Sequence, residues 1–567
     1  HPIFASVISI VIVIAGAVSV GVLPIAQYPE ITPPTVEVST TYPGANARVV
    51  SETVAAPIEQ EVNGVENMIY MSSTSASDGS YKLTVSFNVG TDLDMAQVLV
   101  QNRVKLAEAK LPEEVKRQGV NTKKKSTNIV LIISLFSPDD RFDELYLSNF
   151  ATLRLRDILS RIDGVGDVSV FPQSDYSMRI WLDPPKLKSR DLTTEDVLAA
   201  IREQNVQVPA GQIGRPPAPP GQSFQYTINV LGRLTDIEQF EDIIIKTGEG
   251  GRITRLKDIA RIDLGGKSYD MTSGMTGKPS ASVLIYQLPG ANALDVAGQI
   301  YATMEDLEKN FPEGLAYKIP YDTTIFVDQS IKEVFVTLFQ AAALVFLVLF
   351  VFLQDWRATV VPAVTIPVSL IGTLAVMLAM GFSLNMLTLF GLVLAIGIVV
   401  DDAIVVVEAT AAHMEKGLTA KEAAITAMNE VSGPVVATTL VLLAVFVPSA
   451  FLPGITGEMY RQFALTIAIS TIFSSINALT LSPALAALLL RPPKKRKNMF
   501  FRGFDAVFRK TENVYAGMVK TFVRRTAIML LLFLGLLSLT GWQFTRLPTG
   551  FLPIEDQGYI MASIQLP

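Results

Sequence analysis

The sequence predicts a membrane protein with two parts, a bundle of apolar helices and a large water-facing part of mixed α and β structure. Its composition is 49% hydrophobic and 18% charged, with a mean hydropathy of +0.38, whereas a soluble domain carries about 25% charged residues. Seven apolar stretches are long enough, or nearly so, to cross about 30 Å of hydrocarbon as helices. Residues 28–333, between the first two stretches, instead alternate short strand and helix patterns.

Composition also excludes several classes of function. A net charge of −6 argues against a nucleic-acid binder. The 567 residues contain no cysteine, which excludes disulfides, thiolate zinc sites and a cysteine nucleophile within them. The two histidines, His1 and His413, leave little room for histidine-based metal or acid–base chemistry. Any handling of protons must then fall to carboxylates.

The predicted spans follow the apolar stretches. They are Ile3–Leu23, Val334–Leu353, Val360–Met380, Leu384–Val407, Pro434–Leu452, Phe463–Leu490 and Ala527–Phe544. The first is placed like a signal peptide, but it is too long and lacks a small-residue cleavage site before a mature start. Because the chain opens at His1 without a methionine, we expect a few residues to precede it.

Basic residues in the loops predict the orientation of the spans. The loop 491–526 holds eleven Lys and Arg residues against Asp505 and Glu512, and short loops of this kind stay in the cytoplasm. Counting back across the spans places residues 28–333 on the outer side. Within the loop, the basic and aromatic stretch Met499–Lys520 predicts a helix on the inner membrane surface. An ordinary amphipathic connector is an equal alternative.

The outer region repeats a strand–helix–strand pattern, which favours short βαβ units with open sheets. The predicted strands are Thr35–Thr41, Met68–Ser73, Tyr81–Val89, Ile129–Leu135, Asp167–Phe171, Ser280–Gln287 and Tyr317–Tyr321, and the predicted helices are Ala47–Val62, Met95–Ala109, Leu145–Arg161 and Ala293–Phe311. Residues 174–267 form a different piece, with a proline-rich arm at 208–224. So long an irregular loop is usually functional or reaches a neighbour, the alternative being a plain surface loop.

A proline motif recurs after the first and the last span. Pro24 and Pro29 follow the first span, Pro548 and Pro553 follow the last, and the two prolines are five residues apart in both places. Because repeated halves are common in large membrane proteins, we infer that the last span opens a second copy of the outer region. We therefore expect the chain to be about half of a larger protein.

Two adjacent aspartates, Asp401 and Asp402, lie deep within the apolar stretch Leu384–Val407. Each costs about 2.5–3.5 kcal/mol or more at bilayer depth, and nothing structural in the span needs them. Adjacent side chains point about 100° apart on a helix, so both can face a crevice while meeting different neighbours. The pair suits reversible proton uptake. We expect its basic partner in the remainder of the protein, because no Lys or Arg lies deep in the other six spans.

Two glycines, Gly391 and Gly397, lie on the same span and are expected to allow close approach of a neighbouring helix. Three alternatives to a proton carrier stay open. The aspartate pair can lie at a wetted cytoplasmic helix end. An intramembrane aspartyl hydrolase needs two aspartates that face each other from different helices, whereas these are adjacent. A receptor or assembly platform would leave the buried acids unexplained.

Together these motifs resemble the resistance–nodulation–cell-division (RND) transporters, and among them the multidrug efflux pumps of the hydrophobe/amphiphile family, of the AcrB/MexB type. The segments that carry the resemblance are Pro2–Ala5, Leu23–Pro34, Gly164–Val168, Ala291–Asp295, Pro320–Thr324, Arg357–Thr359, Asp401–Glu408, Tyr460–Phe463 and Phe551–Gly558. They run through the whole chain and match the N-terminal half of such a pump. Metal-exporting relatives carry one aspartate in this span, so the pair here favours organic substrates.

The resemblance implies proton-motive-force-driven efflux, as drug/proton antiport of amphiphilic and hydrophobic compounds across the Gram-negative envelope by a secondary active transporter and not an enzyme. Export of metals or lipids is the alternative within the family. The implied domains are span 1 at 1–27, periplasmic porter subdomains of ferredoxin-like βαβ units at 28–173 and 268–333, a docking subdomain at 174–267 with its arm at 208–224, spans 2–6 at 334–490, a cytoplasmic connector at 491–526, span 7 at 527–546 and the start of a second periplasmic repeat at 547–567.

The resemblance also implies the site. Asp401 and Asp402 are its proton relay. The drug pocket of the family maps onto Ser39, Ile129, Ile132, Ser169, Phe171, Ser268, Met271 and Tyr321, with Phe171 as the best single candidate and core packing as the alternative. The family's prototype has an aromatic side chain and two amides at positions 129, 169 and 268, so substrate preference stays open.

For partners, the resemblance implies a homotrimer that works with a periplasmic adaptor (membrane fusion protein), an outer-membrane channel, the lipid bilayer and small amphiphilic drugs, without nucleic acid. Protons are the coupling ion, and no metal and no cofactor are expected. The location is the inner membrane, as a multi-pass protein with a large periplasmic domain.

Overall fold

The structure, a computed structural model, describes residues 2–29, 33–125, 129–173, 175–207, 211–213, 217, 225–228, 232–269, 271–288, 290–491, 499–547, 556–562 and 564. Three predictions fall wholly or largely outside these ranges. They are the proline-rich arm at 208–224, the second proline motif at 548–553 and the basic cluster at 494–497.

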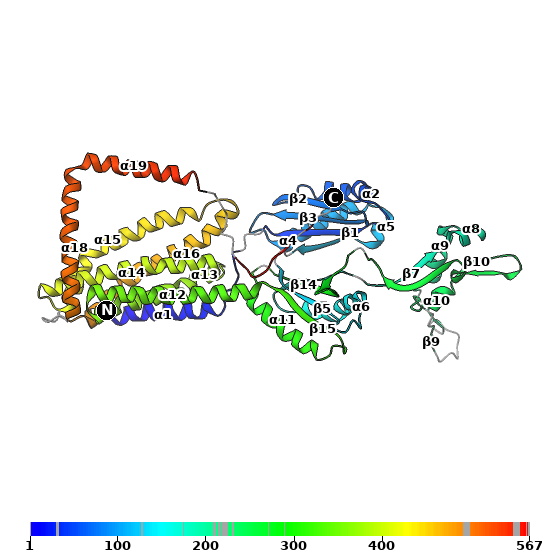
Figure 1. The fold of residues 1–567 in the computed structure, drawn as a ribbon, viewed down its shortest axis with the longest axis horizontal. Coiled ribbons are helices and arrows are strands. Elements are labelled where there is room, and N and C mark those ends of the chain that lie inside the picture. Colours follow the sequence, from blue (N-terminus) through cyan, green and yellow to red (C-terminus); the bar gives the residue numbers. More distant parts are fainter. Residues whose placement is uncertain are drawn as a thin grey trace.

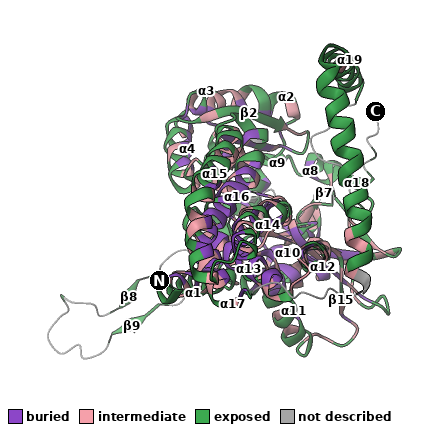
Figure 2. Cartoon of the chain, turned by 90° about the vertical axis from the view of Figure 1, so that its left-hand side faces the viewer, coloured by how far each residue is buried: buried purple, intermediate pink, exposed green. Residues whose placement is uncertain are grey.

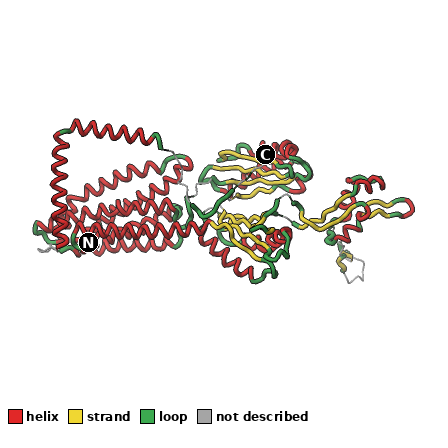
Figure 3. Tube along the Cα trace, viewed as in Figure 1, coloured by secondary structure: helices red, strands yellow, loops and turns green. Residues whose placement is uncertain are grey.

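Three regions follow one another along the long axis of the molecule (Figure 1). Apolar helices form a bundle at one end, two β-sheet units lie in the middle, and a smaller third piece lies at the far end. Figure 3 separates the helical bundle from the strand-rich middle. The predicted combination of helices able to span a membrane with folded β-sheet domains is confirmed.

The first β unit has a four-stranded sheet in the order β2-β3-β1-β4. Its elements are β1 (Thr35–Thr41), β2 (Met68–Ser75), β3 (Ser80–Phe87), β4 (Asn121–Lys125), α2 (Ala47–Val50), α3 (Ala56–Val62), α4 (Leu93–Glu108) and α5 (Glu113–Gln118). A π-helical turn, Ser51–Ala55, joins α2 to α3, so the helix predicted at 47–62 is continuous but not uniform. Because side chains alternate across a strand, Val36 and Val38 enter the core whereas Ser39 lies on the other face.

The second β unit has a sheet in the order β13-β14-β5-β15, with β6 also paired to β14. Its elements are β5 (Ile129–Phe136), β6 (Val165–Phe171), β13 (Gly274–Met275), β14 (Lys278–Gln287), β15 (Ala316–Asp322), α6 (Glu144–Phe150), α7 (Asp157–Leu159) and α11 (Ala293–Glu308). In both units, the strands that a helix joins are separated by a third strand in the sheet. All of the pairs between named strands are therefore antiparallel.

The third piece is inserted between β6 and β14. Its elements are β7 (Tyr176–Leu182), α8 (Pro184–Ser189), α9 (Thr194–Gln204), β8 (Gln212–Ile213), β9 (Tyr226–Thr227), α10 (Ile237–Glu241), β10 (Ile244–Thr247), β11 (Ile253–Arg255) and β12 (Ala260–Gly266). Strands β7 and β12 pair with each other over their whole length. The piece has its own small core, with Leu256 and Ile259 fully buried, and it lies farthest from the helical bundle (Figure 1).

Seven helical segments in the described residues are long and apolar enough to cross a membrane. The helices are α1 (Pro2–Val20), α12 (Thr323–Leu353), α13 (Trp356–Ala379), α14 (Met386–Glu415), α15 (Ala420–Ser449), α16 (Gly454–Leu479) with its continuation α17 (Leu481–Leu489), and α19 (Thr526–Phe544). Helix α12 begins eleven residues before the predicted span. Its first turns carry polar residues, so a prediction from hydropathy starts the span after them. Since β15 ends where α12 begins, the second β unit is joined directly to the bundle.

The helix predicted at Met499–Lys520 is α18 (Met499–Arg524), which crosses the end of the bundle instead of running along it (Figure 1). The ring of Phe352 lies edge-on to those of Phe504 and Phe508, and the amide Nε2 of Gln354 donates to Asp505 Oδ1 at 2.6 Å. In α19, no residue is buried in this chain, and Figure 2 shows α18 and α19 exposed.

Candidate functional site

The two aspartates lie at the middle of the 30-residue helix α14. The side chain of Asp402 is partly buried, and its Oδ2 accepts a hydrogen bond of 2.8 Å from the Ser474 hydroxyl of α16. Asp401 is exposed in this chain. The different surroundings follow from the helix, because adjacent side chains point about 100° apart. That the two acids meet different neighbours stays a prediction, because among the described residues a hydrogen-bond partner is shown for Asp402 alone.

Close contact between α14 and α16 places Ser474 beside Asp402. A Cβ atom on Gly391 would lie 3.2 Å from the carbonyl oxygen of Phe463 in α16, so a larger residue would push the helices apart. At the start of α14, Asn385 caps the helix and donates from Nδ2 to Gln462 Oε1 at 2.8 Å. At Gly397, a Cβ atom would have no neighbour within 4 Å among the described residues. Because no helix among the described residues approaches Gly397 closely, the prediction of close helix approach fails there within this part of the chain.

The same face of α16 is hydrogen-bonded to α13. Ser470 and Thr373 lie 2.9 Å apart through their hydroxyls, and the Asn477 amide Nδ2 donates to Ser369 Oγ at 2.9 Å. All four side chains are fully buried. Buried polar groups are costly without partners, so these bonds fix α16 against α13 on both sides of Ser474.

Five of the predicted pocket residues share one face of the second β unit. Opposite residues in an antiparallel pair point to the same side of a sheet. Ser169 lies opposite Leu284, Leu284 opposite Ile132, and Ile132 opposite Tyr321. Phe171 lies two residues along β6 from Ser169 and so shares its side. Ile129 lies opposite Tyr286, and it joins the same face after a β-bulge.

The remaining predicted residues lie elsewhere. Ser39 is on β1 of the first unit, Ser268 is half-buried just after β12, and Met271 is exposed. Tyr321 packs its ring edge-on to Tyr559 at 4.8 Å between centroids. Burial, followed by the hydrogen bond with Tyr559, raises the pKa of Tyr321 to about 12. Its phenol is therefore neutral at physiological pH.

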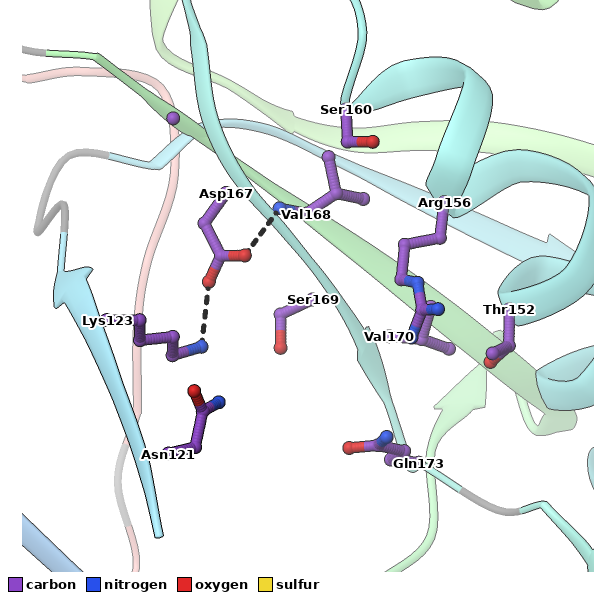
Figure 4. A pocket seen from close by; sticks show the side chains of 11 residues that line it. Asn121, Lys123, Thr152, Arg156, Ser160, Asp167, Val168, Ser169, Val170 and Gln173 are labelled. Atoms are coloured by element: carbon purple, nitrogen blue, oxygen red, sulfur yellow. Dashed lines mark hydrogen bonds and ion pairs between the residues drawn. The ribbon is translucent and has the colours of Figure 1, made fainter. Parts of the chain in front are cut away.

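A cavity of about 390 Å³ lies between the two β units. Its lining residues come from β4, β6, the helical stretch before β6 and the segment just after β6, and they are Asn121, Lys123, Thr152, Arg156, Ser160, Gly166, Asp167, Val168, Ser169, Val170 and Gln173. Figure 4 shows Lys123 reaching across to Asp167, with 3.0 Å between Nζ and Oδ2. The other carboxylate oxygen of Asp167 accepts from the backbone N–H of Val168. The cavity is thus polar, and an ion pair forms part of its lining.

Comparison with known proteins shows to which family the chain belongs. The sequence model of the AcrB/AcrD/AcrF family matches residues 1–567, which is the whole chain. The chain belongs to this family. The resemblance to RND multidrug efflux pumps, drawn above from the motifs, is confirmed.

Curated relatives include three transporters. "Multidrug export protein AcrF" of Escherichia coli (strain K12) is 44% identical over 572 residues, covering 100% of this chain and 55% of AcrF. "Toluene efflux pump membrane transporter TtgB" of Pseudomonas putida is 45% identical over 573 residues, covering 100% and 54%. "Multidrug resistance protein MdtF" of Escherichia coli O157:H7 is 41% identical over 571 residues, covering 100% and 55%. The chain spans about half the length of the curated relatives it matches.

In this AcrB/AcrD/AcrF-family chain, sequence reasoning missed most of the cavity. Of the predicted pocket residues, only Ser169 lines it. Lys123 and Asp167 gave a weak signal, since one belongs to a run of three lysines and the other to a motif that carried the resemblance. Nothing in the sequence indicated that these two residues meet. Leu284, at the centre of the row of pocket candidates, was missed because a leucine in a strand predicts only core packing.

The chemistry of the arrangement follows from the groups that it brings together. Among the described residues, no group of three or more His, Asp or Glu side chains could hold a metal ion. Asp401 and Asp402 supply carboxyl groups, which are able to take up and release protons, and the sheet face and the cavity supply apolar and polar surface.

Proposed function

We propose that the chain is part of a proton-driven exporter of amphiphilic and hydrophobic compounds, a secondary active transporter that exchanges drug for protons across the inner membrane. The observation that carries the proposal is the position of Asp402. It lies at the middle of a 30-residue helix that is apolar enough to cross a membrane, and it is held by Ser474 of a neighbouring span. An acid at such a depth is costly and is expected to serve transport of ions or protons.

The printed names of the relatives support the class of cargo. They describe multidrug export, toluene efflux and multidrug resistance. We extend this class to the present chain as organic compounds with apolar surface. Protons are proposed as the coupling ion, with no cofactor.

The sheet orders support the proposed subdomains. In each β unit, two strand–helix–strand segments interleave with the strand order 2-3-1-4, counted within the unit, and we assign both as ferredoxin-like porter subdomains on the periplasmic side. The third piece, farthest from the bundle, is proposed as half of a docking subdomain (Figure 1). A homotrimer, a periplasmic adaptor and an outer-membrane channel are the proposed partners.

The proposed substrate site is the open face of the second sheet together with the polar cavity beside it. Ile129, Ile132, Phe171 and Tyr321 supply apolar and aromatic surface there, and Ser169 connects the face to the cavity. Ser39, Ser268 and Met271 are proposed at the rim of the site. Because β15 continues into α12, a movement of the helices is passed to this sheet.

The test replaces the acids in the full-length protein that contains this chain. Asp402→Asn, purified and reconstituted into vesicles with an imposed pH gradient, is expected to lose drug export completely, and Asp401→Asn is expected to lose most of it. The matched control is Glu408→Gln, which removes an exposed acid from the same helix and is expected to leave export unchanged. Proton-driven export by Asp402→Asn at the wild-type rate would refute the proposal.

A further inference from the structure

The hydroxyl of Ser474 lies between two acceptors on α14. Its Oγ is 2.8 Å from Asp402 Oδ2 and 2.9 Å from the carbonyl oxygen of Val399, and the side chain is 2% exposed. A serine hydroxyl has one hydrogen to donate, and both a carboxylate and a carbonyl oxygen only accept. While Asp402 is ionised, Ser474 can therefore donate to only one of the two, and the Val399 carbonyl keeps its place in the backbone hydrogen bonds of α14.

The charge on Asp402 decides which acceptor receives the hydrogen. A hydrogen bond to an ionised carboxylate is roughly twice as strong as one to a neutral acceptor, so Ser474 donates to Asp402 in the ionised state. When Asp402 takes up a proton, its own O–H can donate to Ser474 Oγ. The Ser474 hydrogen then turns to the carbonyl of Val399, and all three groups are satisfied.

The bond is located where α16 can pass on this change. One turn to either side of Ser474, on the same face of α16, Ser470 is bonded to Thr373 and Asn477 to Ser369 of α13. These contacts are fully buried. A change in the hydrogen bond between Asp402 and Ser474 therefore affects the positions of α13 and α16 together.

Among the described residues, Ser474 is the side chain that responds when Asp402 binds or releases its proton, because the charged side chains of the neighbouring helices do not contact Asp402. Asp401 acts on it electrostatically from the same helix. The helices packed against α14 are α12, α13, α15, α16 and α17, and their charged side chains contact other groups or solvent and not Asp402. Those charged side chains are Asp328, Lys332, Glu333, Arg357, Lys421, Glu422, Glu430, Glu458 and Arg461.

We propose that Ser474 is a positioning residue that reads the protonation state of Asp402 and transmits it to the α13–α16 pair. The proposal rests on the proposed function, in which Asp402 carries the transported proton. It assigns a role in coupling to a side chain that touches neither the substrate nor the lipid.

The first experiment compares hydroxyl deletions on one helix. In the full-length protein, Ser474→Ala removes the bond to Asp402, and Thr471→Val removes an equally buried hydroxyl whose bond, to the carbonyl of Ile467, stays within α16. We expect Ser474→Ala to slow proton-driven export by about tenfold or more and to shift the pH profile of the rate. Thr471→Val is expected to keep the wild-type profile, and Ser474→Thr, which retains a hydroxyl, is expected to restore it.

The second experiment observes the carboxyl group directly and does not depend on transport. In infrared difference spectra between high and low pH, the C=O stretch lost in Asp402→Asn reports the protonated Asp402. We expect this band to move in Ser474→Ala and in Ser474→Cys, a variant of closer size, but not in Thr471→Val. An unmoved band in both Ser474 variants would overturn the proposal.

The outcomes separate this inference from the proposed function. If the wild-type protein exports drug and Asp402→Asn does not, while Ser474→Ala matches Thr471→Val in rate, pH profile and spectrum, the role of Ser474 is wrong and the proton relay stands. If Asp402→Asn exports at the wild-type rate, the proposed function fails, and the role of Ser474 fails with it.

Discussion

The Nζ atom of Lys123 lies 3.0 Å from Oδ2 of Asp167, and this ion pair joins the edge strands of two different sheets. The two β units have separate hydrophobic cores, so the pair crosses a boundary between independently packed bodies. The side chains are 39% and 34% exposed, and pairs so accessible to water contribute about 0.2–1 kcal/mol. A contact of that size can favour a closed arrangement without preventing its opening.

Reversing one charge of this pair is expected to open the cavity. Lys123→Glu places two carboxylates face to face, and Asp167→Lys places two ammonium groups there. Each single variant is expected to widen the distance between spin labels on the two units, with little change in unfolding temperature. The double variant Lys123→Glu/Asp167→Lys is expected to restore the wild-type distance. A double variant as wide as the single ones would contradict a direct interaction.

Leu284 is expected to control the size of the compounds that the sheet face accepts. It lies between Ser169 and Ile132 in register, and it is outside the buried core of its unit. Leu284→Trp would fill this face without overpacking the core. Resistance of cells to large compounds is expected to fall several-fold, with resistance to small ones preserved. Leu264→Trp, at an exposed position of β12, is the control and is expected to change neither.

Gly16 is expected to be required for the packing of α1 on α13. A Cβ atom at this position would lie 1.9 Å from the carbonyl oxygen of Ile371, so even alanine forces the helices apart. Overpacking of this kind costs about 1–3 kcal/mol. Gly16→Ala is expected to lower the unfolding temperature of the purified protein in detergent. Gly21→Ala, whose nearest contact is an ordinary 3.8 Å, should not, and equal effects would dispute the close approach.

The hairpin between β2 and β3 is expected to loosen in acid. Hydrogen bonds from the side chain and then the backbone of Ser80 lower the pKa of Asp78. A carboxyl whose pKa is lowered by folding stabilises the fold above its unfolded value of about 3.9. That contribution disappears as the pH falls through the lowered value. Hydrogen exchange of the 76–81 turn should therefore accelerate below about pH 4.

The matched variant for this prediction is Asp78→Asn. Its amide oxygen can still accept from Ser80, but it does not titrate. Exchange in the turn of this variant is expected to lack the added acceleration on acidification. The same dependence on pH in both proteins would show that another group governs the turn.

Most elements of the two β units could be predicted from local patterns. Strand β1 has the bounds that alternation predicted, and β5, β6, β14 and β15 differ from their predictions by no more than two residues at either end. The π-helical turns at Ser51–Ala55 and Ala151–Arg156 could not be predicted, because they keep the same helical periodicity over a short stretch. Helix α15 begins fourteen residues before the predicted span, since hydropathy does not register its polar first turns.

The candidate site was predicted in part. Asp401 and Asp402 could be singled out because a charged residue within an apolar stretch is unusual whatever its neighbours in space are. Ser474 did not, since serine is common in helices packed within membranes and its role depends on a helix 72 residues away in sequence. Gly391 and Gly397 looked alike in sequence, and only the packing of α16 distinguishes them.

The sequence by itself determined the number of apolar helices, the strand-and-helix character of the outer region and the family, because each is encoded in composition, periodicity or contiguous motifs. Only the tertiary structure decided which side chains meet. The ion pair of Lys123 with Asp167 and the hydrogen bond of Ser474 with Asp402 form because whole sheets and helices pack together. That stacking is set by the shapes of many buried side chains at once, so no local pattern in the chain reports it.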